Sequence, residues 1–119
     1  MSPAGALLVG LGGAAGAVVR YVTVLAFADR RYPVPTLVVN VLGSFLFGLT
    51  LALGAGDRTV LLVGVGFCGA FTTYSTFSVD TIRLFDEEPG QALAYAAGTL
   101  LACLLAVVLA VALGTLLVP

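Results

Sequence analysis

The sequence predicts an all-α integral membrane protein with four transmembrane helices, and three observations support this. First, 61% of the 119 residues are hydrophobic and only 9% are charged, whereas a soluble domain carries about 25% charged residues. Second, the apolar residues fall into four blocks separated by short turns that are charged or rich in glycine and proline. Third, each block provides the roughly 20 residues that a bilayer-spanning helix needs. We therefore expect a single membrane domain over residues 1–119.

The first span is expected at residues 4–28. Gly12, Gly16 and Arg20 recur at steps of four, so they share one helix face. The small-xxx-small spacing of the two glycines favours close approach of a neighbouring helix. Arg20 is the only charge well inside this span. Two interpretations of it stay open: the side chain snorkels to the interface, or it forms an electropositive vestibule that attracts anions.

The second span is expected at residues 36–55. It carries a stripe of small and polar residues at steps of four, namely Thr36, Asn40, Ser44 and Gly48, on a helix otherwise made mostly of Leu, Val and Phe. Interhelical hydrogen bonds of about 1 kcal/mol each are the common role of such residues in membranes. A ladder of donors beside a pore is the alternative.

The third span, expected at residues 59–85, contains the most unusual stretch of the chain. The run from Gly69 to Ser78 holds five Ser and Thr residues besides a tyrosine. Such side chains compete with the helix for backbone carbonyls, so we predict a break at membrane depth. A bound cation is one partner for carbonyls freed there. Tyr74 and Phe77 lie three residues apart, and the positive edges of two such rings suit a small anion; aromatic packing between helices is the alternative.

The fourth span is expected at residues 91–118, after an acidic loop. Tyr95, Thr99 and Cys103 follow one another at steps of four and share a face. Their side chains either extend the donor track or make helix–helix contacts. The chain offers too few ligands near its two cysteines for a metal site or a disulfide, and its net charge of −1 comes with no basic patch for nucleic acid.

Three segments together resemble a known family. They are Gly16-Ala-Val-Val-Arg20-Tyr21, Thr36-Leu-Val-Val-Asn40-Val-Leu-Gly-Ser-Phe45, and Gly66-Phe-Cys-Gly-Ala-Phe-Thr-Thr-Tyr-Ser-Thr-Phe-Ser78. With Tyr95 in the last span, they are similar in order and spacing to the Fluc or CrcB family of small fluoride channels. The resemblance covers nearly the whole chain.

The resemblance implies an antiparallel, dual-topology dimer with two fluoride pores at the subunit interface and a structural sodium ion at its centre. It places the sodium on the backbone carbonyls of Gly69 and Thr72. It places Asn40, Tyr74, Phe77, Tyr95 and Thr99 along the anion path. The hydroxyls of Thr36, Ser75 and Thr76 are expected beside the same path. The function implied is passive export of fluoride across the cell membrane, by a multi-pass channel in the lipid bilayer rather than an enzyme.

Two positions depart from the family pattern. Tyr74 stands where phenylalanine is usual, and Cys103 stands where a small or hydroxyl residue is commoner. Either departure is compatible with one half of a heteromeric fluoride channel made from two paralogues. A small four-helix multidrug-type transporter is another alternative, but it needs a protonatable carboxylate within the membrane, and Asp80 near the end of the third span is a poor substitute. A non-conducting accessory subunit would explain the glycines but not the hydroxyl run.

Overall fold

The computed structural model describes residues 2–27 and 32–118, and within these ranges the chain is helical and has no strand. Four stretches are long and apolar enough to cross a membrane. They are α1 (Pro3–Ala26), α2 (Val34–Ala52), a composite third helix over Asp57–Glu87, and α6 (Pro89–Leu117). The expected end of the first span at Ala28, and part of the turn that follows it, lie outside the described residues. The protein is therefore a multi-pass membrane protein in form.

Three of these helices begin with a proline in their first turn, namely Pro3, Pro35 and Pro89. Proline suits this place because the first helical N–H groups have no partner within the helix and its φ angle is already helical. In α1 the hydroxyl of Ser2 also accepts a hydrogen bond of 3.0 Å from the Gly5 N–H, which caps the helix. The turn residues thus define where the spans begin.

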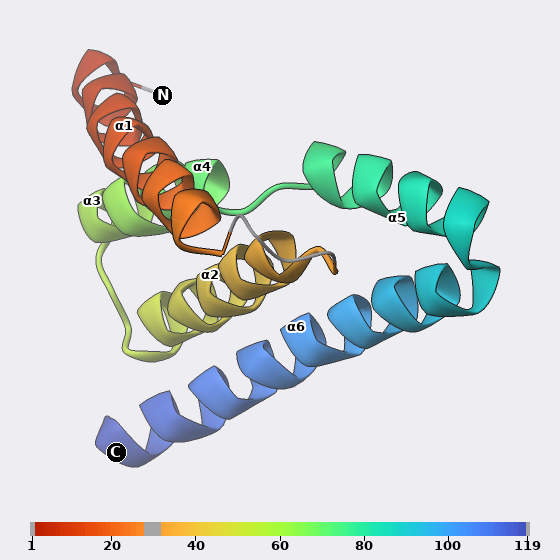
Figure 1. The fold of residues 1–119 in the computed structure, drawn as a ribbon. Helices are drawn as coiled ribbons and strands as arrows, with labels where there is room; N and C mark the ends of the chain where they lie inside the picture. Colours follow the sequence, from red (N-terminus) through yellow and green to blue (C-terminus); the bar gives the residue numbers. More distant parts are fainter. Residues whose placement is uncertain (1, 28–31, 119) are drawn as a thin grey trace.

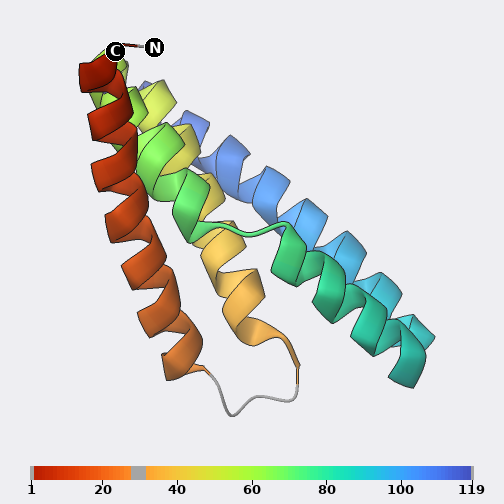
Figure 2. The same ribbon diagram turned by 90° about the horizontal axis from the view of Figure 1, so that it is seen from above.

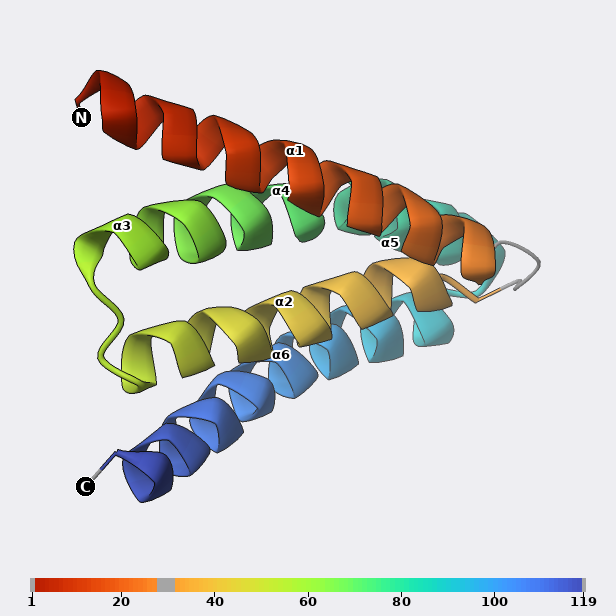
Figure 3. The same cartoon turned by 90° about the vertical axis from the view of Figure 1, so that its left-hand side faces the viewer.

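The helices pack in two pairs (Figure 1), α1 against the first part of the third helix and α2 along α6. The last part of the third helix leaves the first pair and packs on α6 (Figure 2). Both termini lie at the same end of the bundle (Figure 3), as four crossings of a membrane require. The third helix therefore joins the two pairs.

The third helix changes its winding along its length. It begins as α3 (Asp57–Thr59), widens into the π-helix η1 (Val60–Cys68) and ends its first part as α4 (Gly69–Phe71). At the end of η1 the Gly69 N–H donates to the carbonyl of Gly64, five residues back, which is the hydrogen bond of a π-helix. The chain is then extended at Thr72, and it resumes as α5 (Ser75–Glu87) after residues 72–74. The break lies inside the predicted hydroxyl run.

The glycines of α1 allow its backbone to touch that of η1. A Cβ added at Gly12 would overlap the carbonyl oxygen of Leu62, and one added at Gly16 would overlap that of Phe67. Both glycines are buried. The sequence-based prediction that this face admits a close helix neighbour is confirmed, and the neighbour is the π-helical segment.

Replacing Gly16 by alanine is expected to destabilise the fold, because the added methyl group must push the η1 backbone away. Overpacking of this kind costs about 1–3 kcal/mol, which exceeds the gain of up to about 1 kcal/mol in helix propensity. Gly10→Ala is the matched control, since nothing lies within 4 Å of its added Cβ. Loss of helical circular dichroism on heating in detergent measures the effect. Equal midpoints for the two variants would contradict the packing described here.

The outer surface of the bundle is largely apolar. In the most hydrophobic window of each span, only 11% to 28% of the residues are buried inside the chain. Large side chains such as Leu104 and Leu109 are more than half exposed. This surface suits lipid tails or another membrane protein, whereas many of the buried residues are small or polar.

Candidate ion-binding pocket

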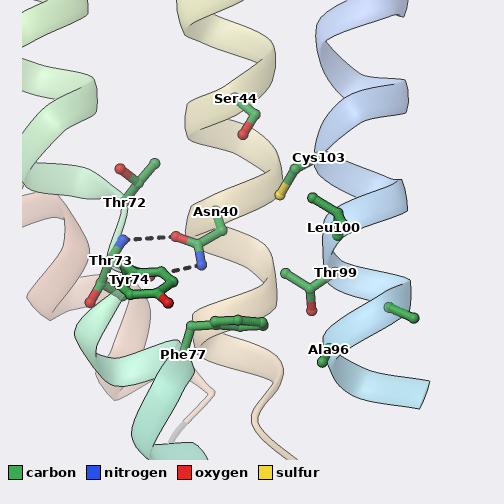
Figure 4. A pocket seen from close by; sticks show the side chains of 11 residues that line it. Asn40, Ser44, Thr72, Thr73, Tyr74, Phe77, Ala96, Thr99, Leu100 and Cys103 are labelled. Carbon is green, nitrogen blue, oxygen red and sulfur yellow. Dashed lines mark hydrogen bonds between the residues drawn. The ribbon is translucent and has the colours of Figure 1, made fainter. Parts of the chain in front are cut away.

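Asn40 of α2 holds the break in the third helix. Its Oδ1 accepts a hydrogen bond of 2.8 Å from the Thr73 N–H, and its Nδ2 donates one of 3.0 Å to the Thr73 carbonyl (Figure 4). Both directions are consistent with one orientation of the amide. The side-chain NH₂ carries two hydrogens, so one N–H remains for another acceptor. Asn40 is thus a structural clamp with a spare donor.

This clamp changes the bonding of the carbonyls in α4. In a continuous helix the Thr73 N–H would donate to Gly69, four residues earlier, but here it turns to Asn40. The Thr72 N–H still reaches the carbonyl of Cys68, at 3.0 Å. The carbonyl of Thr72 itself is approached by the Arg20 guanidinium from α1, at 3.4 Å. The break therefore releases the Gly69 carbonyl from its helical partner and places a cation beside that of Thr72.

Beside the break lies a pocket of about 610 Å³ between α2, α5 and α6. Its walls carry polar groups from all three sides and no ionised side chain among the described residues (Figure 4). The lining residues are Asn40, Ser44, Thr72, Thr73, Tyr74, Phe77, Ala96, Ala97, Thr99, Leu100 and Cys103. The pocket offers neutral donors at membrane depth, which is an environment for an ion that must enter and leave.

Three aromatic rings adjoin this pocket. The ring centroids of Tyr74 and Phe77 lie 6.3 Å apart, and those of Phe77 and Tyr95 lie 5.3 Å apart. Tyr74 lies in the break, before α5 begins. The first two rings are therefore brought together by the break itself and not by a shared face of one helix. Tyr74 is 82% exposed, whereas Tyr95 is buried and also meets Tyr32 edge-on at 5.6 Å. The rings form a row from the surface to the interior.

Two hydroxyls of α6 are buried without a hydrogen-bond partner among the described residues, those of Tyr95 and Thr99. The two residues are only 1% and 5% exposed, and they lie one helical turn apart on the face directed at α2 and α5. A buried hydroxyl without a partner costs about 1–3 kcal/mol. Such groups in a native protein indicate a water or ion that satisfies them.

The carboxylate of Asp80, which was not predicted in the site, lies near these hydroxyls. Asp80 of α5 accepts a hydrogen bond of 2.8 Å from the Thr36 hydroxyl and pairs with Arg83 at 3.6 Å. The signal available in the sequence was Thr36, a polar residue at the start of the α2 stripe that needs a partner across the helix interface. The hydrogen bond between Thr36 and Asp80 joins α2 to α5. Along α5 it lies beyond Phe77, away from the break.

Not every residue expected on the anion path lines the pocket. Asn40, Tyr74, Phe77 and Thr99 do, whereas Thr36 and Tyr95 do not. Ser75 and Thr76 also lie outside it and are exposed. They surround the hydroxyl of Thr73, which accepts from the Thr76 N–H at 3.1 Å and lies 3.4 Å from the Ser75 hydroxyl. The Thr73 hydroxyl is thus the group that caps the start of α5, and it accepts from the backbone of Thr76.

The fold and the pocket define a small four-span membrane protein with neutral donors gathered at a broken helix. Residues 7–111 match the family described as CrcB-like protein, Camphor Resistance (CrcB). Since this match covers most of the sequence, the chain belongs to the CrcB family.

Several relatives in this family have printed names that state a function. The chain is 54% identical over 112 residues to "Fluoride-specific ion channel FluC 2" of Natronomonas pharaonis, covering 92% of this chain and 93% of the relative. It is 53% identical to "Fluoride-specific ion channel FluC 1" of Halobacterium salinarum, covering 88% and 89% of the two chains. A similar protein of that name from Geobacillus kaustophilus is 43% identical, with 80% and 84% covered.

Proposed function

We propose that this protein is a fluoride-selective channel that lets fluoride leave the cell passively, lowering the cytoplasmic concentration. The observation that carries the proposal is the set of unpaired donors at the pocket. They are the buried hydroxyl of Thr99 and the spare N–H of Asn40, both on the pocket wall. They come from two helices and face a pocket whose described lining residues include no carboxylate. The relatives named as fluoride-specific channels support the choice of anion.

Neutral donors suit fluoride because this ion is small and strongly hydrated. Replacing its water requires several convergent donors, and a channel must not hold the ion so strongly that it stays. A fixed cation in the pocket would hold the anion too tightly. Arg20 is the nearest candidate, and its guanidinium contacts the backbone of Thr72 from the α1 side rather than lining the pocket. This position fits a vestibule that attracts anions without trapping them.

The multidrug-type alternative finds little support in the pocket. Such a transporter needs a carboxylate that binds and releases protons or substrate within the membrane. Asp80, the acidic side chain near the pocket in the described part of the chain, accepts from Thr36 and pairs with Arg83. It is engaged as a tie between α2 and α5. We therefore assign no second function.

A second copy of the chain in antiparallel orientation is part of the proposal, in the cell membrane. The exposure of Tyr74 supports a partner on this face, because a phenol that is 82% exposed at membrane depth would otherwise put its hydroxyl into lipid. On α6, the side chains of Leu100 and Leu104 are also more than half exposed. The relatives' names include both FluC 1 and FluC 2, so a paralogue in place of the identical chain is the alternative.

A sodium ion at the break is the remaining part of the proposal. Among the described residues no three His, Cys, Asp or Glu side chains gather as a metal site, and the ligands proposed here are backbone carbonyls at the break. The Gly69 carbonyl fits this role because the Thr73 N–H that would normally occupy it donates to Asn40. The Thr72 carbonyl keeps a second lone pair beside the Arg20 contact. Two carbonyls from each of two chains would surround the ion.

Sodium is expected to raise the thermal stability of the dimer. A ligand that binds only the folded state stabilises it by about 2.7 kcal/mol at 100 times its Kd. The measurement is the unfolding temperature in sodium chloride against N-methylglucamine chloride of equal ionic strength, with light scattering to follow dimer mass. Identical unfolding temperatures in the two salts across a wide concentration range would remove sodium from the proposal.

Fluoride efflux is the direct test of the proposed function. Purified protein in liposomes loaded with potassium fluoride is expected to release fluoride rapidly when valinomycin is added, as measured with a fluoride electrode. Liposomes loaded with potassium chloride should retain chloride, because the donors are arranged for a smaller ion. Absence of fluoride release from the single purified chain would contradict the homodimer and direct the search to a paired paralogue.

A further inference from the structure

Cys103 places a thiol on the wall of the polar pocket. It lies on α6, one turn beyond Thr99, and is partly exposed. Its sulfur points from α6 toward Asn40 and Ser44 of α2 (Figure 4). The other cysteine, Cys68, is 4% exposed and lines a neighbouring cavity of about 270 Å³, which shares Ser44 and Thr72 with the polar pocket but does not include Cys103. The two thiols of the chain therefore differ in their access to the pocket.

An independent observation marks this part of the pocket as a place where a ligand binds. The Thr99 hydroxyl, on the same face of α6 as Cys103, is buried and has no partner among the described residues. It belongs to the lining of the same pocket. A buried hydroxyl in this condition requires a partner, which is either water or a bound group. A substituent on the Cys103 sulfur would thus lie beside the position where that group sits.

We propose that Cys103 is a modification site that closes the anion pathway when it carries a mixed disulfide. The inference rests on the proposed function. The modifying molecule is a small, uncharged thiol-reactive compound, either a thiosulfonate or a low-molecular-weight disulfide. Uncharged molecules are favoured because the described lining of the pocket has no ionised side chain to pair with a charge and the surrounding apolar helices disfavour one.

The chemistry of the step follows ordinary thiol exchange. The Cys103 thiol gives its proton to water, and the thiolate sulfur attacks the sulfenyl sulfur of the reagent. With methyl methanethiosulfonate, the S–S bond of the reagent breaks and methanesulfinate leaves with the electron pair. Cys103 then carries an S–S–CH₃ group. A dithiol reductant reverses the step by exchange, which releases methanethiol and leaves the reductant as its cyclic disulfide.

The adduct blocks the pathway by changing its polarity and width together. It replaces a small thiol with a longer, apolar group opposite Asn40 and beside Thr99. The dehydrated anion would then lose access to these donors without gaining a substitute. A larger substituent, such as benzyl in place of methyl, is expected to block more completely because it fills more of the pocket.

The experiment treats the full-length protein in liposomes with methyl and benzyl methanethiosulfonate. Mass spectrometry counts and locates the adducts, and a fluoride electrode records efflux, each variant being compared with its own untreated sample. The variants are wild type, Cys68→Ala, and both Cys103→Ser and Cys103→Ala in case one of these folds poorly. We expect one adduct at Cys103, loss of most of the efflux in wild type and Cys68→Ala, recovery with dithiothreitol, and no effect of the reagents on the Cys103 variants.

The possible failures are distinguishable. If untreated protein releases no fluoride, the homodimeric channel is wrong and the closing role at Cys103 falls with it, whereas adduct mapping still decides whether the Cys103 thiol is accessible. If untreated protein conducts and a labelled Cys103 leaves efflux unchanged, the closing role is wrong. Labelling of Cys68 alone, or equal inhibition of the Cys103 variants, would also overturn the inference.

Discussion

Replacing Phe77 by isoleucine is expected to lower fluoride efflux by at least about tenfold, which corresponds to about 1.4 kcal/mol on the barrier, while the protein still folds. The ring of Phe77 lies between those of Tyr74 and Tyr95, at centroid distances of 6.3 and 5.3 Å. Its positive edge is a site for a dehydrated anion, and isoleucine has no such edge. Isoleucine still fills much of the same volume, and apolar swaps of similar volume usually cost less than about 1.5 kcal/mol in stability.

The matched control is Phe85→Ile, the same substitution on the same helix. Phe85 is 52% exposed and lies outside the pocket, so its efflux should stay close to that of wild type. Size-exclusion profiles of both variants in detergent show whether assembly is preserved. Normal efflux by Phe77→Ile, with normal assembly, would remove the row of rings from the conduction mechanism.

The four-span fold and the position of the break could be predicted from the sequence because both depend on local composition. Long apolar blocks specify spans whatever their neighbours are. The run of hydroxyl residues that competes with the helix is likewise a local signal, and the structure interrupts the third helix within it at residues 72–74. The glycines at 12 and 16 predicted a close contact, although not its partner.

The π-helical winding of residues 60–68 could not be predicted in the same way. It depends on how the third helix fits against the exposed backbone of α1, and no local pattern encodes that fit. The contact between Thr36 and Asp80 escaped prediction for a similar reason. Both residues were visible in the sequence, but their meeting requires the angle at which α5 leaves the break.

Ser75 and Thr76 show the opposite situation, because local composition suggested a role that the pocket described here does not include. Their hydroxyls lie within the polar run, so they were expected beside the anion path. In the structure they are exposed and bond with Thr73 at the start of α5. Side-chain hydroxyls at a helix N-terminus commonly serve the local backbone, and Phe77 is the residue of α5 that lines the pocket.

Replacing Asn40 by alanine is expected to abolish fluoride efflux and to lower stability. The substitution removes the partners of both the Thr73 N–H and the Thr73 carbonyl, each of which costs about 1–3 kcal/mol if left unpaired. The Thr73 N–H is then free to return to the Gly69 carbonyl and extend α4 by one residue. This removes an oxygen proposed for sodium, so the variant should also lose the stabilisation by sodium.

The variant Asn40→Asp tests two roles of Asn40 separately, namely its hold on the break and its spare N–H donor. The carboxyl group keeps an acceptor for the Thr73 N–H, so the break and the response to sodium should persist. In either protonation state it lacks the second N–H that Asn40 offers the pocket, and when ionised it repels the anion. Because the aspartate also lacks the Nδ2 donor to the Thr73 carbonyl, we expect this variant to unfold below the wild-type temperature but to keep its response to sodium. It should conduct at least about tenfold more slowly, an increase of about 1.4 kcal/mol in the barrier.

Ser44→Ala provides the control for both Asn40 variants. Ser44 lies one turn along α2 and lines the same pocket, but among the described residues its hydroxyl makes no hydrogen bond to the break. Its loss should leave the unfolding temperature and the sodium effect in place. If Asn40→Ala instead kept both its sodium response and its efflux, the break would be stable without the amide, and the spare donor of Asn40 would have no part in moving the anion.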